Sequence, residues 1–345
     1  MNKSTVFILA GGAGTRLKPL SLTGAGKLPK QFLRLFGKST LLQEAIKRIP
    51  TGNSVIIVPE AVYSDEVRKQ AGEMGIHVEV FQEPFGCNTG PAVIAAAAKT
   101  AILDQDPSRV ICFLPADHMM DADEFMALFN QAVERASETD KIITIGITPT
   151  RPDTGYGYIR VEALHKESVQ QVRKFVEKPD RETALGYLES GDYFWNAGIF
   201  FGKAQVFLDL CSIHCPEIIQ PIQKHISTAG FDITAAYEEI KKEKNTQSID
   251  YALMEKIPQH IELVKASQDL EWNDLGNWES IAPFLETDSE DNQWLIKSPP
   301  DLNHAKEVMV FNYTEIPVQI NDLSGLVVVV TENGILIRPK ISMKT

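Results

Sequence analysis

A glycine-rich turn follows the first apolar run of the chain and could bind a phosphate. The run is Val6–Leu9, and the turn reads Gly-Gly-Ala-Gly-Thr-Arg from Gly11 to Arg16. Without a Cβ, a glycine lets backbone N–H groups come close to a phosphate oxygen. Arg16 ends this turn, and Lys27 and Lys30 follow it, so these three cations lie close to the glycines in sequence. The spacing predicts an anion-binding loop, with a simple tight turn as the alternative for the glycines alone.

The loop matches neither of two common phosphate-binding motifs. The dinucleotide pattern G-x-G-x-x-G would start at Gly12, but Leu17 stands where its third glycine belongs. A triplet at Gly37 resembles the end of a Walker A loop, yet Phe32 occupies the position of the first glycine. A dinucleotide fold and a P-loop are therefore not predicted.

Two aspartates stand where strands are expected to end. Asp117 follows the apolar run at 110–114 within Pro-Ala-Asp-His, and Asp274 follows the last long strand within Asn-Asp-Leu-Gly. In open α/β sheets the ligand crevice lies at the carboxyl ends of the strands. Mg²⁺ prefers one or two carboxylates plus substrate phosphates. The pair therefore predicts a shared Mg²⁺ site, and the alternative for Asp117 is a cap on the following helix.

Alternating strand and helix patterns must position these residues. Short β-branched runs predict strands at 6–9, 55–58, 76–81, 110–114 and 142–147. Apolar residues at helical spacing predict helices at 41–49, 63–73, 90–103 and 123–136. This alternation is typical of an α/β domain with a Rossmann-like, mostly parallel sheet that is covered on both faces.

The pattern changes in the second half of the chain. From Tyr156 to Phe201 we expect shorter strands with intruding turns, as in an insertion that builds a second wall of a pocket. Helices are expected up to about Lys256, then a strand at 261–265 and a helix at 277–285. The acidic stretch 286–292 indicates a linker, and runs at 308–311, 318–320, 326–330 and 335–337 predict a small all-β domain. The expected domains are 1–285 and 286–345.

Composition and charge exclude several classes of protein. The chain has 345 residues, 43% of them hydrophobic, which is ordinary for a globular protein and rules out a disordered or collagen-like chain. The net charge of -12 argues against a nucleic-acid or anionic-membrane binder. We expect neither a secretory signal nor a membrane span. Four scattered cysteines do not predict a disulfide framework, so a reducing cytoplasm is the expected location.

The motifs, taken in order, resemble those of the sugar-1-phosphate nucleotidyltransferases, most closely the guanylyltransferases that act on mannose 1-phosphate. The resemblance covers residues 6 to about 285. It rests on the loop 9–17, Pro-Lys-Gln-Phe at 29–32, Glu-Pro at 83–84, Asn-Thr at 88–89, Pro-Ala-Asp-His at 115–118, Tyr-Gly-Tyr-Ile at 156–159, Phe-Val-Glu-Lys-Pro at 175–179, Trp-Asn-Ala-Gly-Ile-Phe at 195–200 and Trp-Asn-Asp-Leu-Gly at 272–276. The all-β tail resembles, more loosely, the short left-handed β-helix of many family members.

The resemblance implies transfer of GMP from GTP to mannose 1-phosphate, with Mg²⁺ as cofactor and GDP-mannose and pyrophosphate as products. The sugar phosphate is already ionised at pH 7, so it can attack the α-phosphorus without a protein nucleophile or a strong general base. Neither nucleic acid nor a membrane is an implied partner, and a homodimer stays open. Also open are the same reaction on another hexose or heptose 1-phosphate, and a weakly catalytic regulatory homologue that binds a nucleotide sugar.

The resemblance also implies roles for individual residues. Arg16 would steady the departing pyrophosphate, and Lys30 would sit between the two reacting phosphates. The metal ligands would be Asp117 and Asp274. The nucleotide would be bound by Gly11, Gly12, Gly14, Thr15, Glu83, Asn88 and Thr89. The sugar phosphate would be bound by Gly157, Glu177, Lys178 and Asn196.

Three departures from the family pattern fall at the nucleotide and phosphate loops. Family members usually carry Trp where this chain has Lys18, and Arg where it has Cys87. The segment 22–27 is a few residues longer than the usual link. These departures leave the nucleotide preference open, whereas the two metal aspartates and the two key lysines are present.

Two other motifs are weighed and disfavoured. Asp121-Ala122-Asp123 imitates the D-x-D metal motif of glycosyltransferases, but acidic residues in the first turn of a helix are the favoured interpretation. Cys211, His214 and Cys215 could suggest zinc, but no second pair of ligands completes a tetrahedral site.

Overall fold

The computed structural model describes residues 4–12, 17–21, 28–35, 37–162, 168–296 and 300–340. The chain forms two compact units. The first comprises Met1–Gly12, Leu42–Ala116 and Met120–Trp272, and the second comprises Ala13–Leu41, Asp117–Met119 and Asn273–Thr345. The domain boundary expected after residue 285 stays a prediction.

A mixed β-sheet forms the centre of the first unit. In the described part of the chain it has nine strands in the order β3-β2-β1-β4-β8-β5-β11-β7-β6. Their bounds are β1 Thr5–Leu9, β2 Ser54–Val58, β3 Glu79–Val80, β4 Val110–Pro115, β5 Ile142–Ile147, β6 Tyr158–Val161, β7 Val169–Val176, β8 Tyr193–Lys203 and β11 Ile261–Lys265. The α/β class is confirmed.

The expectation of a mostly parallel sheet is wrong. Strands β1, β2, β3 and β4 pair in parallel, as do β5 and β11. Strand β8 runs antiparallel between β4 and β5, and β6 and β7 add further antiparallel pairs. The segment from Tyr156 to Phe201 is therefore no separate insertion with short strands. It supplies the eleven-residue strand β8 inside the sheet.

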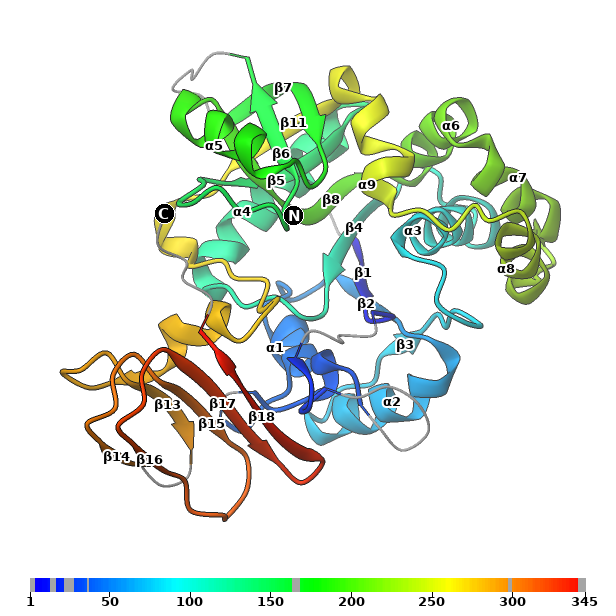
Figure 1. The fold of residues 1–345 in the computed structure, drawn as a ribbon. Helices are drawn as coiled ribbons and strands as arrows, with labels where there is room; N and C mark the ends of the chain where they lie inside the picture. The colour runs from blue at the N-terminus through cyan, green and yellow to red at the C-terminus, as the bar shows by residue number, and fades with distance from the viewer. Residues whose placement is uncertain are drawn as a thin grey trace. The chain divides into compact units, whose positions relative to one another are not determined.

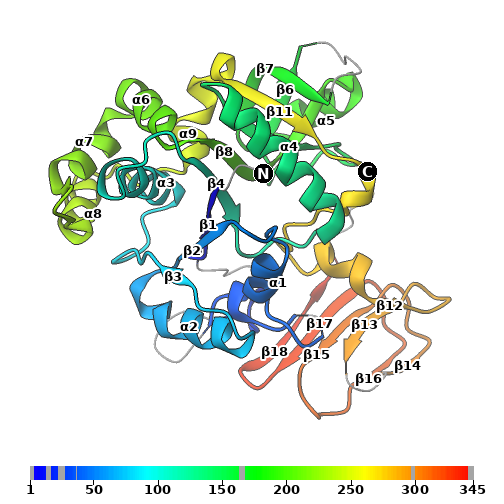
Figure 2. The ribbon, with the colours of Figure 1, turned by 180° about the vertical axis from the view of Figure 1, so that it is seen from behind.

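Alternating side chains of the strands pack against different helices. Phe113 of β4 stacks on Phe7 of β1 and meets Phe207 of α6 (Ala204–His214) edge to face. Phe201 of β8 instead meets Phe129 of α4 (Ala122–Glu138). Because successive side chains of a strand point to opposite faces, both faces of the sheet are buried under helices. Figure 1 shows α3, α6, α7 and α8 grouped together, and Figure 2 shows α4 along β11.

The helices begin and end close to the expected positions. Their bounds are α1 Leu41–Lys47, α2 Ser64–Glu73, α3 Thr89–Ala98, α4 Ala122–Glu138, α5 Arg181–Ser190, α6 Ala204–His214, α7 Pro216–His225, α8 Ile233–Lys242 and α9 Ile249–Ala252. Two expectations are wrong in detail. The strand at 76–81 is reduced to Glu79–Val80, and the region 277–285 contains a 3₁₀-helix, Glu279–Phe284, interrupted by Pro283.

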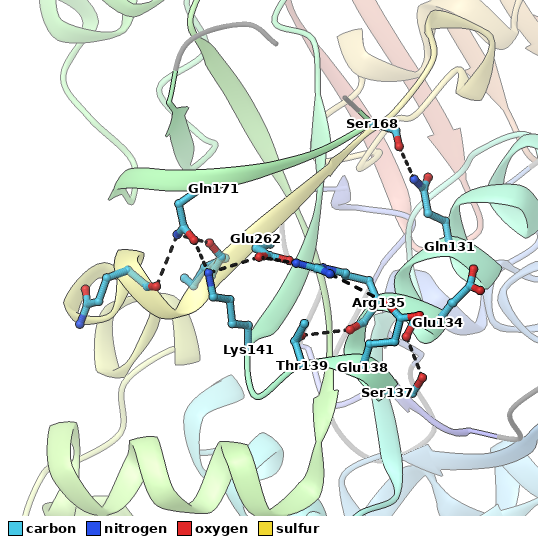
Figure 3. Close-up of polar contacts among 12 residues, drawn as sticks. Gln131, Glu134, Arg135, Ser137, Glu138, Thr139, Lys141, Ser168, Gln171 and Glu262 are labelled. Atoms are coloured by element: carbon cyan, nitrogen blue, oxygen red, sulfur yellow. Dashed lines mark hydrogen bonds and ion pairs between the residues drawn. The ribbon is translucent and has the colours of Figure 1, made fainter. Parts of the chain in front are cut away.

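A buried carboxylate ties α4 to the sheet. Glu262 of β11 receives two hydrogen bonds from Arg135 of α4, at 2.6 and 3.0 Å, and an ion pair from Lys141 at 3.2 Å (Figure 3). Burial raises the pKa of Glu262, but the contacts with Arg135 and Lys141 outweigh burial and leave it below its usual value. The carboxylate is therefore ionised at neutral pH, and the network stabilises the first unit.

The second unit contains the C-terminal strands. Strands β13 Gln293–Ile296, β15 Met309–Asn312 and β17 Leu326–Thr331 pair in parallel, with β12 Glu286–Thr287 and β18 Gly334–Pro339 antiparallel at the edges. Strands β14 Asp301–Asn303 and β16 Gln319–Asn321 form a second parallel pair. Trp278 packs on Phe311 beneath them. The four expected C-terminal strands are confirmed. The parallel pairing of β13, β15 and β17 in one sheet, and of β14 with β16 in another, is typical of a solenoid.

None of the helices in the described ranges is both long enough and apolar enough to cross a lipid bilayer.

Candidate active site

Gly11, which follows β1, lies against a buried carboxylate. A Cβ on Gly11 would stand 2.6 Å from Oε2 of Glu83, so no larger residue fits there without displacing Glu83. Among the described residues, no atom lies within 4 Å of a Cβ added to Gly12. The other four residues of the expected phosphate loop, Ala13, Gly14, Thr15 and Arg16, lie outside the described residues, as does Lys27.

Glu83 is held inside the first unit. The Tyr237 hydroxyl donates to Oε1 of Glu83 at 3.0 Å, and the residue is 5% exposed. Burial and the nearby charge of Glu60 raise the pKa of Glu83 to about 8, against the opposing hydrogen bond from Tyr237. Burial and Glu83 in turn raise the pKa of the Cys87 thiol to about 11. Glu83 therefore supports the glycine turn, and its role in the base pocket stays a prediction.

The Asn-Thr motif begins α3. Asn88 adopts φ 68° and caps the helix by accepting the Thr89 N–H at 2.9 Å. The Thr89 hydroxyl oxygen accepts the N–H of Ile249 at 3.0 Å, and Gly90 N–H donates to the carbonyl of Gln247 at 3.0 Å. The motif thus contacts the segment from Gln247 to Ile249 at the start of α9. Its contact with the nucleotide stays a prediction.

In the second unit, the expected phosphate lysine meets the expected metal aspartates. Lys30 Nζ lies 3.0 Å from Oδ2 of Asp117 and donates to the carbonyl of Asp274 at 2.7 Å and to that of Leu275 at 3.1 Å. Leu275 adopts φ 48°, a strained conformation for a branched residue. The Lys30 ammonium therefore joins two segments that are far apart in sequence, one at Asp117 and one at Asp274.

Oxygen donors at this cluster fit a hard divalent cation. The side chain of Asp117 is 32% exposed, and burial, which would raise its pKa, is outweighed by the charges of Lys30 and His118. Its pKa is therefore below the usual value, and the carboxylate is ionised. Asp274 accepts the Gly276 N–H on Oδ1 at 3.0 Å. No group of three acidic, histidine or cysteine ligands occurs among the described residues, but Mg²⁺ needs only one or two carboxylates beside phosphates.

The predicted sugar-phosphate residues form one cluster in the first unit. A Cβ on Gly157 would stand 2.5 Å from Oε2 of Glu177 and 3.2 Å from Cβ of Asn196. Lys178 Nζ pairs with Oε1 of Glu177 at 2.7 Å. The Asn196 N–H donates to the Gly157 carbonyl at 2.8 Å. Strand β8, the end of β7 and the start of β6 thus bring all four residues together.

The cluster combines one accessible cation with a buried acid. The Lys178 side chain is 44% exposed, whereas that of Glu177 is 7% exposed. Lys178 adopts φ 48°, which marks the turn as strained. Burial and the negative charge of Asp250 raise the pKa of Glu177 to about 7, against the opposing contact with Lys178. An anion can reach the ammonium while the carboxylate stays inside, which suits a ligand with both a phosphate and hydroxyl groups.

Three acidic or phenolic residues contact these clusters although the sequence motifs do not include them. Tyr237 bonds Glu83, Asp250 bonds Asn196, and Glu255 accepts the backbone N–H of Glu177 at 2.7 Å. Each lies on or beside a helix far along the chain from its partner. An amphipathic pattern places Tyr237 in the core, but no local spacing predicts which strand residue these groups contact.

The two disfavoured motifs have structural roles. Asp121 caps α4 by accepting the N–H groups of Asp123 and Glu124, which confirms the interpretation as a helix start. It also means that Asp117 is not the cap of that helix. Cys211 and Cys215 are buried and free of disulfides.

The chain is similar to known proteins over most of its length. A sequence profile of nucleotidyl transferases matches residues 5–290. A mannose-1-phosphate guanylyltransferase of Klebsiella pneumoniae is 33% identical over 340 residues, which are 96% of this chain and 69% of that protein. A putative mannose-1-phosphate guanylyltransferase of Vibrio cholerae is 36% identical over 343 residues, with coverages of 96% and 70%.

A solved structure is similar over almost the whole chain. It is that of a Thermus thermophilus protein named mannose-1-phosphate geranyltransferase, which is 27% identical and superposes with a TM-score of 0.82. The match covers 98% of this chain and 95% of that one. With a profile match that spans most of its length, the chain belongs to the nucleotidyl transferase family.

Proposed function

We propose that this chain transfers GMP from GTP to mannose 1-phosphate and releases GDP-mannose and pyrophosphate. The names of relatives that align with 96% of the chain support this substrate pair. The observation within the chain that carries the proposal is the cluster of Gly157, Glu177, Lys178 and Asn196. It offers a cation for a phosphate beside oxygen and amide groups for sugar hydroxyls.

The reaction needs alignment and charge neutralisation more than a protein nucleophile. An oxygen of the sugar phosphate forms a bond to the α-phosphorus of GTP, and the bond from that phosphorus to the bridging oxygen of the β-phosphate breaks. The electron pair leaves on pyrophosphate. Two polyanions must come together, and two unit charges 4 Å apart repel by roughly 4 kcal/mol at an effective dielectric of about 20. Cationic side chains offset this repulsion.

Individual residues have distinct tasks in the proposal. Lys178 would bind the sugar 1-phosphate, and Glu177 would accept hydrogen bonds from sugar hydroxyls. Lys30 would neutralise the reacting phosphates, and Arg16 would stabilise the departing pyrophosphate. The position of Lys30 against Asp117 supports its place beside the metal ligands.

Mg²⁺ would be held by Asp117 and Asp274. When bound, such a cation neutralises phosphate oxygens and fixes their orientation. The Asp117 carboxylate and the backbone carbonyl of Asp274, which both contact the Lys30 ammonium, support this donor set. Because Lys30 already contacts Asp117, the lysine and the metal ion would share one carboxylate.

The nucleotide would occupy the glycine turn. Gly11, Gly12, Gly14 and Thr15 would bind the triphosphate through backbone groups, and Glu83, Asn88 and Thr89 would line the base and ribose pocket. We also propose that the nucleotidyltransferase domain spans 1–285 and that the C-terminal strands at 286–345 form a short left-handed β-helix. The chain would work in the cytoplasm, where GTP is available, and a homodimer is its proposed assembly.

Pyrophosphate release tests the substrate pair. Purified protein with Mg²⁺ is given each of the four common nucleoside triphosphates, crossed with mannose, glucose and heptose 1-phosphates. Release confined to GTP with mannose 1-phosphate is the expected result. Release with another pair would keep the reaction class and reject the substrate.

A second candidate is a regulatory homologue that binds a nucleotide sugar without turnover. The buried Cys87 at a position where family members carry Arg favours it. The absence of pyrophosphate release with every substrate pair, from folded protein that binds GDP-mannose by calorimetry, would support this candidate. Cys87→Arg separates the two further, because a marked gain of turnover with GTP would show that the native residue limits nucleotide use.

A further inference from the structure

Asp250 contacts the sugar-phosphate cluster, although none of the motifs includes it. It is in the first turn of α9, whose N-terminus is capped by Ser248. The Asn196 side chain donates from Nδ2 to Oδ1 of Asp250 at 2.8 Å. Asp250 is therefore a direct partner of a residue predicted to hold the sugar.

The Asn196 side chain is fixed at both ends. Its Oδ1 accepts the N–H of Gly198 at 2.9 Å, while its Nδ2 donates to Asp250. A side-chain amide has two N–H donors and two acceptor lone pairs, so one of each is used inside the protein. The remaining donor and lone pair keep a single orientation only while Asp250 holds the amide. Loss of this acceptor would let the amide rotate.

Asp250 also acts on the charged pair of the cluster. Its negative charge interacts with Glu177 and with Lys178. The ammonium of Lys178 contacts the Glu177 carboxylate at 2.7 Å and is also attracted by the charge of Asp250. Glu255 adds a third acid, which fixes the Glu177 backbone N–H. Lys178 is the cation among these groups. The position of its ammonium therefore depends on the carboxylates of Glu177 and Asp250.

In the segment 247–250, the backbone and the Asp250 side chain contact different motifs. The backbone carbonyl of Gln247 and N–H of Ile249 bond Gly90 and Thr89, which belong to the predicted nucleotide motif. The carboxylate of Asp250 instead bonds Asn196 of the sugar motif. A substitution of the Asp250 side chain therefore perturbs the sugar motif without removing a contact to the nucleotide motif.

We propose that Asp250 is a positioning residue for a sugar 1-phosphate: its carboxylate fixes the amide of Asn196 and, with Glu177, holds the Lys178 ammonium in place for the phosphate. This inference rests on the function proposed above and adds to it a residue that determines how the sugar is held. Asp250 would not touch the substrate and would act through Asn196, Glu177 and Lys178.

Two substitutions separate its hydrogen bond from its charge. Asp250→Ala removes the acceptor, and Asp250→Asn keeps an acceptor oxygen but removes the charge. A hydrogen bond to a charged group contributes enough that its loss corresponds to about a 10-fold or larger change in an equilibrium constant. We expect Asp250→Ala to raise the KM for mannose 1-phosphate by about 10-fold or more, whereas Asp250→Asn recovers most of the loss. The KM for GTP is expected to stay unchanged in both variants.

Asp180→Asn is the matched control. Asp180 is an exposed acid two residues beyond Lys178, and it caps α5 by accepting the Thr183 N–H at 2.8 Å. Asparagine caps a helix about as well as aspartate, so this variant removes a nearby charge while keeping the fold. We expect it to leave both KM values unchanged. Melting curves of all variants report whether the fold is retained.

The pH profile gives a readout that a purely structural role would not move. The charged groups that face Glu177 are Lys178, Asp250 and Glu255. Burial and Asp250 raise the pKa of Glu177 to about 7, so the acid limb of kcat/KM for mannose 1-phosphate is expected near that pH. Asp250→Asn removes one negative neighbour, and the limb is expected to move to lower pH. Titration of the substrate phosphate is common to both proteins and cancels in the comparison.

Each outcome decides the proposal. Unchanged KM for mannose 1-phosphate in Asp250→Ala, equal losses for GTP and sugar phosphate, or an unmoved acid limb in Asp250→Asn would overturn it. If the wild-type chain turns over no substrate pair, the proposed function has failed. Calorimetric binding of mannose 1-phosphate then decides the positioning role: about 10-fold weaker binding by Asp250→Ala would support it, and equal or absent binding by both proteins would reject it.

Discussion

Replacing Gly157 by alanine tests whether the sugar-phosphate cluster depends on close packing of its backbone. The added Cβ would stand 2.5 Å from Oε2 of Glu177 and 3.2 Å from Cβ of Asn196. Carbon and oxygen atoms without a bond between them need more than 3 Å, so the Glu177 carboxylate must shift. It is buried and paired with Lys178, and its backbone N–H is held by Glu255. The shift therefore disturbs the contacts of the predicted sugar site.

The magnitude follows from overpacking and from the displaced carboxylate. Overpacking a closely packed site costs about 1–3 kcal/mol. A weakened hydrogen bond to a charged group costs about 1.5–3 kcal/mol. If only the second cost affects binding, the KM for mannose 1-phosphate should rise by about 10-fold to 150-fold. The KM for GTP should change by less than about threefold, since neither cost falls on the nucleotide motif.

Gly186→Ala is the matched control for this substitution. Gly186 lies inside α5 of the same unit, and no atom of the described part of the chain lies within 4 Å of a Cβ added there. Alanine in a helix interior is favoured over glycine by about 0.5–1 kcal/mol, so this variant should melt slightly higher and keep both KM values. Steady-state kinetics with each substrate varied, and thermal melts, are the assays. A Gly157→Ala enzyme with the wild-type KM for sugar phosphate would refute the reasoning.

Three further predictions concern other described clusters. Asp117→Asn and Asp274→Asn should each lower kcat by at least about 100-fold, because each removes a charge that would bind the metal ion. The melting temperature should stay within a few degrees, because little core volume is removed. Normal turnover in either variant would reject the metal assignment. Lys30→Met should bind Mn²⁺ more tightly by calorimetry, because the ammonium at 3.0 Å no longer competes for Asp117; weaker binding would contradict this. Glu262→Gln should lower the free energy of unfolding by about 1–3 kcal/mol at pH 7 in urea titrations, and an unchanged value would reject the role of that network.

The network at Glu262 also predicts the direction of a pH dependence. The pKa of Glu262 is lowered in the folded chain, so its stabilisation is present above the unfolded-state value of about 4.3 and is lost as the pH falls through the lower folded-state value. The difference in unfolding free energy between wild type and Glu262→Gln should therefore shrink below about pH 4. A difference that stays constant down to pH 2 would contradict the ionic role.

Local patterns predicted most elements of the fold, because periodicity reports which face of a segment is buried. The run at 110–114 and the amphipathic stretch at 123–136 became β4 and α4 with shifts of one or two residues at their ends. Strand direction was not predictable in the same way. Strand β8 pairs with β4 and β5, which are far from it in sequence, and a buried strand carries the same apolar run whether its neighbours are parallel or antiparallel.

The candidate site was predictable where a motif is continuous in sequence. Glu177, Lys178 and Asn196 are predicted from their motifs, and the structure places them in one cluster with Gly157. The contact of Lys30 with Asp117 joins segments 87 positions apart in the chain, and that of Asn196 with Asp250 spans 54 positions. No pattern within one segment specifies such pairs, because they arise from tertiary packing alone.

An isotope experiment tests the proposed reaction most directly. Mannose 1-phosphate labelled with ¹⁸O in its phosphoryl oxygens is incubated with GTP, Mg²⁺ and the protein, and the products are analysed by mass spectrometry. Attack by the sugar phosphate on the α-phosphorus predicts that GDP-mannose carries all of the label and that pyrophosphate carries none. Label in pyrophosphate, or the absence of GDP-mannose from folded protein, would contradict the account.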